Sequence, residues 1–515
     1  MSNTPKHGSY ISLEELENLN NRIANEITTS SAFENLKPIV KNAINLNAYN
    51  YFFPDLVADP QNRLDSTVEV IKGLKDLGTA MKDTETASDD SGIPAAFTYF
   101  GQFIDHDITL EAASDIIANV NFELPFFDPI PPADLKDKLK NTRSGSFDLD
   151  SLYTNAPKDN GKLRIGNVSL VPVGQRPPNK IDGNDLPRKD DPKRTAEIGD
   201  PRNDENTIIA QLHVAFLKFH NAVMAKQGVD FLTAEKIVRQ HYQWIVIHDF
   251  LKRICDPAIV NEILTNGNKI YNPTDENFFM PVEFSAAAYR FGHSMVRTNY
   301  NFNLFFNLNP EPPTLVPASL DLLFRFTGLS GDMNGEPTLP QNWIIEWENL
   351  LPFQTGKHSK ARKIDTKLTV ALQRLPGGVG VFQFLAKRNL LRGYLLSLPT
   401  GQALARRLLN EAEVLTPEQV LNNASAEERA ALESAGLHIK TPLWYYVLAE
   451  AAIQTNGQHL GKLGSIIVAA TIIGLIRRSE NSILQEKNWQ PTLGTDFNLE
   501  QLLLFTNLGP GQQEQ

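Results

Sequence analysis

Apolar residues recur every three or four positions along most of the chain, which is the spacing of helices that bury one face. Ser12 and Glu15 form a capping box that predicts a helix to about Thr29, and Pro94 predicts the start of a second helix over 94–113. Further helices are expected over 206–225, 234–253, 283–298, 365–374, 400–412, 416–436, 441–453 and 463–477. Strand-like alternation is sparse, so the sequence predicts a mainly α fold with little β structure.

A long stretch between residues 125 and 200 is rich in proline, glycine, aspartate and asparagine. This composition predicts loops, and so long a loop region in a compact domain is usually functional. No internal repeat and no clear linker divides the chain. We therefore expect an N-terminal arm with a helix (1–40), a single large helical domain (41–507) and a short tail (508–515).

The bulk composition narrows the class of protein. The chain has 515 residues, 41% of them hydrophobic, so it can enclose a core deep enough for a large prosthetic group. Its formal net charge of −11 argues against a nucleic-acid partner and against an anionic membrane surface. The longest apolar run, Leu463–Ile476, is too short for a membrane span and predicts a buried helix.

The single cysteine and the N-terminal residues give information about the cellular compartment of the protein. Cys255 has no partner for an internal disulfide and is expected to be a small buried apolar residue. Residues 1–10 are polar and lack the apolar stretch of a standard secretory signal. These observations predict a protein that is cytoplasmic or exported by a route without such a signal.

One predicted helix carries polar residues on an otherwise apolar surface. Gln102, Asp105 and His106 lie at positions i, i+3 and i+4 and so share a face. Polar groups on so apolar a helix must find partners or line a pocket. The segment alone leaves open whether His106 is a hydrogen-bonded core histidine or a pocket residue.

Two more segments carry candidate chemistry. GDPRNDEN (199–206) places Arg202 and Glu205 three residues apart at the mouth of a long helix, and alone it also fits a solvated loop. EFSAAAYRFGHSMVR (283–297) places Arg290 and His293 on one face after small alanines, which let a flat group approach the backbone. Alone, this segment also fits an ordinary core histidine with a surface arginine.

Together these segments suit a haem. Neutral imidazole is the commonest axial ligand of haem iron, and an asparagine carbonyl can hold its other ring nitrogen. Peroxide needs a base that takes one proton and returns it to the departing oxygen, and a fixed cation nearby. His106 and Arg202 are the right residue types for these two tasks, since arginine stays charged throughout.

A fourth segment, SGSFDLDSLY (144–153), presents side-chain oxygens at alternate positions: Ser144, Ser146, Asp148 and Asp150. Ca²⁺ prefers six to eight oxygen ligands, some of them backbone carbonyls, although a simple polar turn also fits this pattern. Asp107 points away from the side of the helix that bears His106 and could complete such a site. His213 and His220, seven residues apart, are instead expected to be packing residues with hydrogen-bonded tips.

The segments resemble a known family, the animal-type haem peroxidases of the peroxidase–cyclooxygenase superfamily, and most closely its bacterial branch. The likeness runs from about residue 40 to about residue 507. The motifs that carry it are FGQFIDHDIT, SGSFDLDSLY, DPRNDEN, HVAFLKFHN, YRFGHS, RNLLRGYLLSLPTGQ and LWYYVLAEA, in the family's order. Domain 41–507 is accordingly expected to be a haem peroxidase domain.

The resemblance implies a role for each matching residue. His106 corresponds to the distal base, Gln102 to the halide and water pocket, Arg202 to the distal arginine and His293 to the proximal iron ligand. Asn389 corresponds to the hydrogen-bond partner of His293, and Arg290 and Arg392 to partners of the haem propionates. Asp105 and Glu205 match the carboxylates that can become ester-linked to haem b. The calcium ligands of the family correspond to Asp107, Ser144, Ser146 through its carbonyl, Asp148 and Asp150.

The resemblance also implies an activity: hydrogen peroxide oxidises the haem to an oxyferryl intermediate, which then oxidises a small donor, consistent with a role in the response to oxidative stress. The position after Glu205 is Asn206, where myeloperoxidase has a methionine linked to haem. Without that link, bromide, iodide, thiocyanate or a phenol is a more plausible donor than chloride.

Two alternatives stay open. A fatty-acid dioxygenase of the same superfamily would carry its radical-forming tyrosine three residues before the proximal histidine, where this chain has Arg290, with Tyr289 one step off. The other alternative is a non-catalytic calcium-binding or adhesion module on a peroxidase scaffold. The presence of every expected catalytic residue argues against this second alternative.

Overall fold

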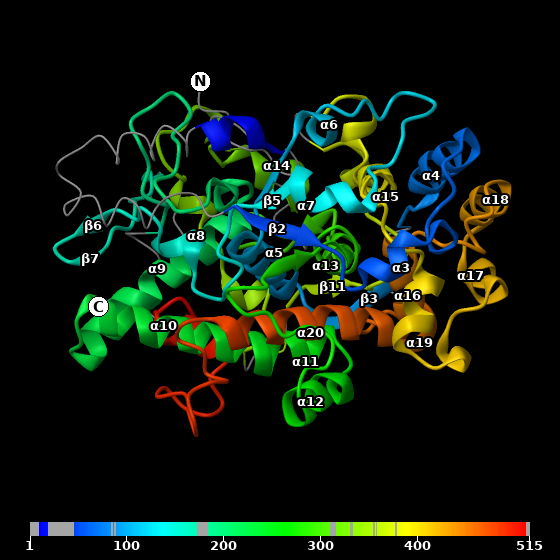
Figure 1. Ribbon diagram of the computed structural model, residues 1–515. Helices are drawn as coiled ribbons and strands as arrows, with labels where there is room; N and C mark the ends of the chain where they lie inside the picture. The colour runs from blue at the N-terminus through cyan, green and yellow to red at the C-terminus, as the bar shows by residue number, and fades with distance from the viewer. Residues whose placement is uncertain are drawn as a thin grey trace.

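The computed structural model describes residues 10–18, 46–83, 86, 89–171, 184–308, 316–329, 333–353, 356, 358–375 and 378–510. Helices dominate this part of the chain, and the few strands are short, which confirms the prediction of a mainly α fold (Figure 1). The longer helices are α4 (Val68–Ala80), α5 (Ala96–Ile108), α9 (Thr207–Gln227), α10 (Phe231–Ile245), α12 (Pro257–Asn266), α15 (Leu385–Leu395), α19 (Leu443–Thr455) and α20 (Lys462–Arg478).

Shorter helices join these elements. The α-helices among them are α3 (Pro54–Ala58), α6 (Asp115–Ala118), α7 (Leu135–Lys138), α8 (Asp150–Tyr153), α11 (Leu251–Ile254), α13 (Val282–Ser285), α14 (Leu320–Arg325), α16 (Gly401–Leu408), α17 (Pro417–Asn423), α18 (Ala426–Ser434) and α21 (Leu499–Phe505). The 3₁₀ turns used below are η5 (Pro201–Asp204), η7 (Ala288–His293), η11 (Val370–Gln373) and η12 (Gly380–Gln383). A π-helical segment, η6 (Val246–Phe250), joins α10 to α11.

A small sheet lies beside α5 and gathers distant parts of the chain. Its strand order is β1-β4-β5-β2-β8, where β1 and β4 are parallel, β5 is antiparallel to both β4 and β2, and β2 runs parallel to β8. The strands are β1 (Ile11–Ser12), β2 (Asn47–Asn50), β4 (Glu111–Ala113), β5 (Leu139–Asn141) and β8 (Phe279–Pro281). The remaining strands form two-stranded pairs: β3 (Asp90–Pro94) with β11 (Lys360–Arg362), β6 (Lys158–Asp159) with β7 (Lys162–Leu163), and β9 (Asn299–Tyr300) with β10 (Ala318–Ser319).

Several predicted helices differ from the structure: the helix expected over 365–374 is reduced to η11, the one expected over 400–412 ends at Leu408, and the one expected over 416–436 is divided into α17 and α18. The helix expected over 94–113 stops at Ile108, because residues 111–113 pair with β5 and β1 instead of continuing the helical turn. The helix expected over 283–298 is replaced by α13 and the tighter η7 turn. In these last two places tertiary contacts outweigh the local helical pattern. The expected N-terminal helix is present from Leu13 to Asn18, and its continuation to Thr29 falls outside the described residues.

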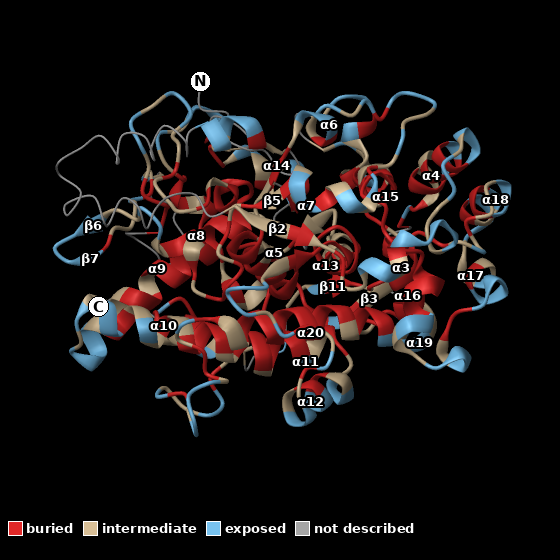
Figure 2. Ribbon diagram, viewed as in Figure 1, coloured by how far each residue is buried: buried red, intermediate tan, exposed pale blue. Residues whose placement is uncertain are grey.

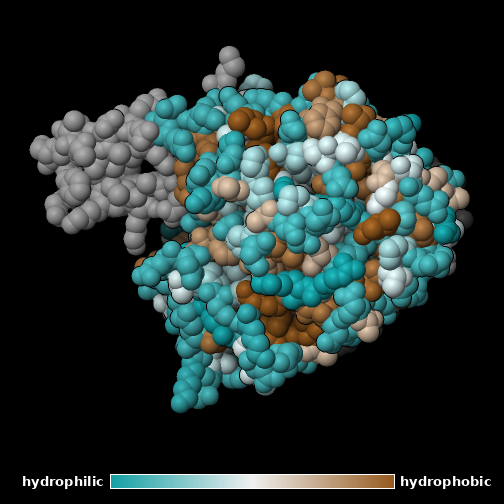
Figure 3. Space-filling model, turned by 45° about the vertical axis from the view of Figure 1, so that its right-hand side comes forward, coloured by the Kyte–Doolittle hydropathy of each residue, from teal (hydrophilic) through white to brown (hydrophobic). Residues whose placement is uncertain are grey.

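The apolar helices are buried as predicted. The α20 helix, drawn in orange across the lower half of Figure 1, is almost wholly red in the burial view of Figure 2. It contains the run 463–476, whose apolar side chains are buried except for the partly buried Ile466, and Cys255 is likewise buried and free. On the face shown in Figure 3, hydrophilic residues predominate and hydrophobic residues form separate patches. Within the described residues α9 alone has the length and hydropathy of a membrane span, and 72% of its apolar window is buried inside the protein.

A buried ion-pair network anchors η5, the turn that carries Arg202. Arg188 lies between Asp185 at 2.8 Å and Asp204 at 2.7 Å, and all three side chains are at most 4% exposed. Asp204 also accepts a hydrogen bond from the backbone N–H of Gly328 at 3.0 Å. A buried charge is tolerated only when it is paired, so Arg188 holds two otherwise isolated carboxylates in the core.

We predict that Arg188→Leu lowers the free energy of unfolding by about 3–5 kcal/mol, because it leaves two buried carboxylates without a cation. Arg194→Leu is the matched control, since its partner Asp190 is 98% exposed and such surface pairs contribute little. Urea unfolding of both variants measures the difference. Equal, small losses in the two variants would contradict the anchoring role of Arg188.

Candidate functional site

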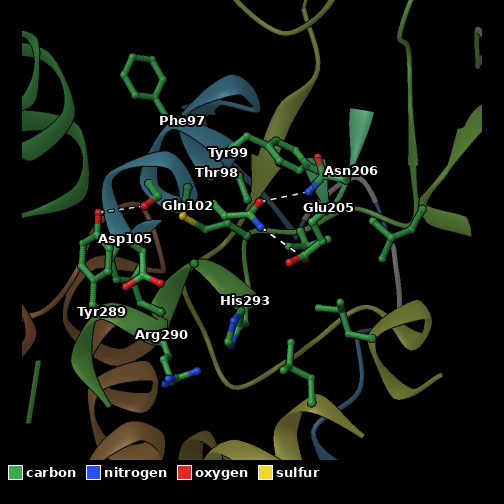
Figure 4. A pocket seen from close by; sticks show the side chains of 18 of the residues that line it. Phe97, Thr98, Tyr99, Gln102, Asp105, Glu205, Asn206, Tyr289, Arg290 and His293 are labelled. Carbon is green, nitrogen blue, oxygen red and sulfur yellow. Dashed lines mark hydrogen bonds between the residues drawn. The ribbon is translucent and has the colours of Figure 1, made fainter. Parts of the chain in front are cut away.

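A cavity opens between α5, η7 and residues 205–206, which follow η5, with its remaining wall formed by α14, η11 and α15. It encloses about 930 Å³ of space that no atom fills, and part of this space is continuous with solvent. Gln102, Asp105, Glu205, Arg290 and His293 all line it (Figure 4). The structure therefore brings three separate sequence motifs to one place.

The tight η7 turn presents His293 and Arg290 to this cavity. In a 3₁₀ helix the side chains at i and i+3 are eclipsed, so these two residues lie on the same face. The side-chain amide of Asn389, from α15, lies 2.8 Å from His293 Nδ1. The structure places the amide nitrogen there, and a 180° rotation of the amide would bring its carbonyl oxygen to the same point. With the carbonyl facing Nδ1–H, the lone pair of His293 Nε2 is left for a metal.

Two arginines share one carboxylate beside the cavity. Arg392, from α15, forms an ion pair with Glu111 of β4, and Arg290 Nη2 lies 3.8 Å from the same carboxylate. The side chains of Arg290 and Arg392 are 17% and 8% exposed, and the Nε of each lacks a hydrogen-bond partner. The partly exposed Arg290 and the buried Arg392 therefore have the capacity to hold further anionic groups.

The α5 side of the cavity carries the carboxylates and amides. Gln102 Nε2 donates to Glu205 Oε1 at 3.5 Å, and Gln102 Oε1 accepts from Asn206 Nδ2 at 3.2 Å (Figure 4). Asp105 accepts a hydrogen bond from Thr109 Oγ1 at 2.9 Å and also faces the cavity. The two carboxylates expected to flank a haem thus lie on the wall of one cavity.

His106 is next to the cavity wall but not part of it. Its ring is fully buried, Nδ1 lies 2.8 Å from Asn203 Oδ1, and Nε2 has no hydrogen-bond partner. Burial, helped by the cation of Arg202, lowers the pKa of His106 to about 4. The imidazole is therefore neutral near neutral pH and has an unused ring nitrogen.

Arg202 is held close to His106 by a partner that the sequence analysis missed. Its guanidinium binds Asp200, with Nη2 2.7 Å from Oδ2, and donates to the backbone carbonyls of His106 at 3.2 Å and Thr109 at 2.5 Å. Burial lowers the pKa of Arg202, but the Asp200 carboxylate outweighs this and raises it. Arg143 also pairs with Asp200. Arg202 itself does not line the cavity.

The acidic loop after β5 lies against the far side of α5, as predicted. The backbone N–H of Leu149 donates to Asp107 Oδ2 at 3.3 Å, Ser144 Oγ donates to Asp148 Oδ2 at 3.0 Å, and the N–H of Ser144 donates to Asp150 Oδ2 at 3.4 Å. Burial and the mutual repulsion of these carboxylates raise the pKa of Asp107 well above its usual range and that of Asp148 to about 7.

The turn of this loop depends on one glycine. Gly145 has a φ of +64°, and a Cβ there would meet the ring of Phe278 at 2.1 Å. Ser144 Oγ accepts a hydrogen bond from the backbone N–H of Ser146 at 3.1 Å. Among the described residues, no three histidine, cysteine or acidic side chains converge as closely as the ligands of a bound metal ion.

Sequence reasoning missed Asp200, Asn203 and Glu111. Asp200 carried a local signal, because it precedes a proline and caps η5 by accepting from the backbone N–H of Arg202. Asn203 and Glu111 carried no local signal in the sequence, because their partners are distant along the chain. His213 and His220 are buried and hydrogen-bonded, as expected. Nδ1 of His213 lies 3.0 Å from Asn203 Nδ2, and Nδ1 of His220 lies 3.0 Å from the Tyr153 hydroxyl.

The residues present fit a haem. His293 and its amide partner stand at one side of the cavity, and the partly buried arginines match the two anionic propionates of a haem. Apolar side chains complete the wall for the porphyrin: Val296, Leu320, Phe324, Leu372, Leu375 and Leu385. His106, whose Nε2 has no hydrogen-bond partner, belongs to the same helix as the cavity residues Gln102 and Asp105.

Known proteins resemble parts of this chain. The family model of the animal haem peroxidase matches residues 123–317. A peroxidase-like protein of Margaritifera margaritifera is 27% identical over 427 residues, which cover 69% of this chain and 50% of that protein. A peroxidasin homolog of Caenorhabditis elegans is 28% identical over 171 residues, 31% of this chain and 12% of that protein. The chain thus spans half or less of the length of these curated relatives.

Solved structures share the fold. Peroxidase A of Dictyostelium discoideum superimposes with a TM-score of 0.54 at 16% identity, over 85% of this chain and 89% of that one. A fatty acid alpha-dioxygenase variant of Oryza sativa with palmitic acid gives a TM-score of 0.51 at 13% identity, over 86% of this chain and 77% of that one. The closer likeness to a bacterial branch stays a prediction. The family model matches residues 123–317 and the solved structures share the fold, so the chain is similar to the animal haem peroxidases.

Proposed function

We propose that the protein is a haem peroxidase that uses hydrogen peroxide to oxidise small anions or phenols. The match to the animal haem peroxidase model over residues 123–317 supports haem binding and an oxidoreductase activity. The single observation that carries the proposal is that α5 and η7, the elements of His106 and His293, line one cavity. His293 itself lines this cavity, whereas His106 is buried next to the α5 wall.

His293 Nε2 would bind the haem iron, with Asn389 fixing the ring through Nδ1. Arg290 and Arg392 would bind the propionates, and Asp105 and Glu205 would lie near the haem methyl groups, where ester links can form. When bound, haem supplies an iron centre that exchanges electrons with peroxide and with a donor. The protein contributes orientation, proton transfer and the exclusion of water.

On the α5 side, the neutral His106 would take a proton from peroxide at Nε2 and return it to the departing oxygen. Asp200 and the two backbone carbonyls fix the Arg202 guanidinium beside this base, where it supplies a permanent positive charge. Gln102 would order water or a small anion between the base and the donor. Its amide already binds both Glu205 and Asn206, so its position is determined.

The residue at position 206, Asn206, indicates which electron donors to expect. Asn206 lines the cavity and hydrogen-bonds Gln102, at the position where a haem-linked methionine would otherwise stand. An amide cannot form a sulfonium link and so withdraws no electrons from the haem. Bromide, iodide, thiocyanate and phenols are therefore proposed as donors in preference to chloride.

We also place a calcium ion in the acidic loop. Asp107 Oδ1 and Asp148 Oδ1 are buried without hydrogen-bond partners, and three carboxylates face one another across α5 and the loop. Buried like charges need a cation, and hard oxygen ligands suit Ca²⁺. Ser144 and the carbonyl of Ser146 would complete the ligands and draw the loop together around the ion. The ion would tie this loop to α5 and steady His106.

A fatty-acid dioxygenase is the second candidate, because Tyr289 also lines the cavity beside an apolar wall. The Tyr289 hydroxyl donates to the backbone carbonyl of Gly101 at 3.1 Å, and its ring stacks on Phe284 with centroids 4.6 Å apart. Because the Tyr289 phenol is already hydrogen-bonded and packed, the peroxidase is favoured over the dioxygenase. Oxygen uptake with linoleate, in the absence of any other donor, would favour the dioxygenase.

We predict that His106→Ala lowers the second-order rate constant for peroxide by roughly 10²–10⁴-fold, because the variant loses its general base. Stopped-flow absorption of the haem-loaded protein measures the shift of the Soret band after stoichiometric peroxide, with bromide, thiocyanate and a phenol added in turn. His438→Gln, in the turn after α18, is the control and should react like the wild type. A wild-type Soret band that is indifferent to peroxide would contradict the proposed function.

Arg392→Leu is expected to weaken haem binding by about 10- to 100-fold, because a charge-assisted hydrogen bond to a propionate contributes about 1.5–3 kcal/mol. Transfer of haem to an excess of apomyoglobin measures this loss. Arg406→Leu, which removes an exposed pair with Glu411, is the matched control. Equal haem retention in both variants would count against the propionate role of Arg392.

Calcium should raise the thermal unfolding temperature of the protein, and chelation with EGTA should reverse the effect. At 100 times the dissociation constant the expected stabilisation is about 2.7 kcal/mol. Asp148→Asn should abolish this response, whereas Asp134→Asn, whose carboxylate pairs with Lys138 outside the loop, should retain it. Differential scanning calorimetry gives the measurement. An unchanged transition with and without Ca²⁺ would remove the calcium site from the proposal.

A further inference from the structure

One side-chain amide joins two buried histidines. Asn203, in η5, has its Oδ1 2.8 Å from His106 Nδ1 and its Nδ2 3.0 Å from His213 Nδ1. His106 comes from α5 and His213 from α9, and all three residues are inaccessible to solvent. The second ring nitrogen of each histidine, Nε2, has no hydrogen-bond partner.

The chemistry of an amide fixes where the protons lie. An amide oxygen only accepts hydrogen bonds and an amide nitrogen only donates them. His106 must therefore carry its proton on Nδ1, which leaves a lone pair on Nε2. His213 must accept at Nδ1, which places its own proton on Nε2. A 180° rotation of the amide would exchange both tautomers together, so the two rings always hold opposite tautomers.

We infer that Asn203 is a positioning residue that holds His106 in the Nδ1–H tautomer, with His213 fixing the orientation of the Asn203 amide. The inference rests on the proposed function in one respect, because the tautomer matters for catalysis only if His106 is the base. A base that must take a proton at Nε2 cannot act when that nitrogen already carries one. The tautomer of a histidine is set by the hydrogen bond of its other nitrogen.

The surroundings leave the amide few substitutes. Asn203 is enclosed in the interior with His106 and His213, so bulk water does not compete for these hydrogen bonds. The backbone N–H of Asn203 donates to the carbonyl of Asp200 at 3.0 Å, and Asp200 holds the Arg202 guanidinium. One short turn thus sets the orientation of both the base and the neighbouring cation.

The first test needs no haem. Long-range ¹H–¹⁵N correlation spectra of haem-free protein labelled with ¹⁵N-histidine distinguish the two neutral tautomers, and His106→Gln and His213→Gln assign the signals. We expect the Nδ1–H pattern for His106 and the Nε2–H pattern for His213. In Asn203→Leu, His106 should shift toward Nε2–H. An Nε2–H pattern for His106 in the wild type, or tautomers unchanged in Asn203→Leu, overturns the inference.

The second test uses the haem-loaded protein and hydrogen peroxide. Asn203→Leu should lower the second-order rate constant by at least about tenfold, within the roughly 10²–10⁴-fold that a general base contributes. Asn203→Asp keeps an oxygen that accepts from His106 Nδ1 but cannot donate to His213. It should therefore restore most of the rate while the His213 signal still changes. If Asn203 were purely structural, the peroxide rate and the His213 signal would not respond separately to Asn203→Asp. Asn203→Asp also provides the test if Asn203→Leu fails to fold.

Asn221→Leu is the matched control, because Asn221 lies on α9, like His213, and makes two hydrogen bonds, both to the backbone of Leu163, at 2.9 and 2.8 Å. It should lower stability without altering the His106 tautomer or the peroxide rate. Wild-type rates in Asn203→Leu overturn the positioning role. If the wild-type tautomers are as expected but the haem-loaded protein ignores peroxide, the proposed function fails and the tautomer assignment stands.

Discussion

A buried polar contact between α5 and η5 is the constraint on which the rest of the site depends. Arg202 reaches from η5 to the carbonyls at the end of α5, and Asn203 reaches from the same turn to His106. Unpaired, any of these groups would be costly in the interior. Because these contacts join the two elements in the interior, they hold α5 and η5 in one relative position. The cavity wall formed by Gln102, Asp105 and Glu205 is a consequence of that position.

Two further networks extend this constraint outwards. Arg188 binds Asp204 at the end of η5 and so ties the turn to the preceding loop. On the other side of α5, Asp107 faces the acidic loop that begins after β5. The helix is thereby held from both sides by charged groups, while its phenylalanines pack into the core. Such an arrangement suits a residue like His106, whose function requires a fixed ring and a free nitrogen.

The opposite wall of the cavity, which η7 forms, is held by different kinds of contact. The η7 turn is short and tight, and it aligns Arg290 with His293 without a long helix. The α15 helix supports this turn: its Asn389 contacts His293, and one helical turn later its Arg392 binds Glu111, the carboxylate near Arg290. The α5 side thus relies on buried hydrogen bonds, whereas the η7 side relies on an amide, the partly exposed Arg290 and the buried Arg392. This difference matches a proton-transfer site facing a site that must accept a large anionic group.

The sequence by itself determined the residue types, the mainly α fold and the motifs that meet in the cavity, because helical periodicity and short motifs are local properties. It also placed Asp107 on the face of α5 opposite to the cavity, since helix geometry fixes that direction. It could not show that residues 111–113 leave the helix for a strand, that Arg202 is bound by Asp200, or that Glu111 joins two arginines. Nor could it connect Asn203 with both His106 and His213. These contacts were decided only by the tertiary structure, because a buried polar group takes whichever partner the packed chain brings within reach, however distant in sequence.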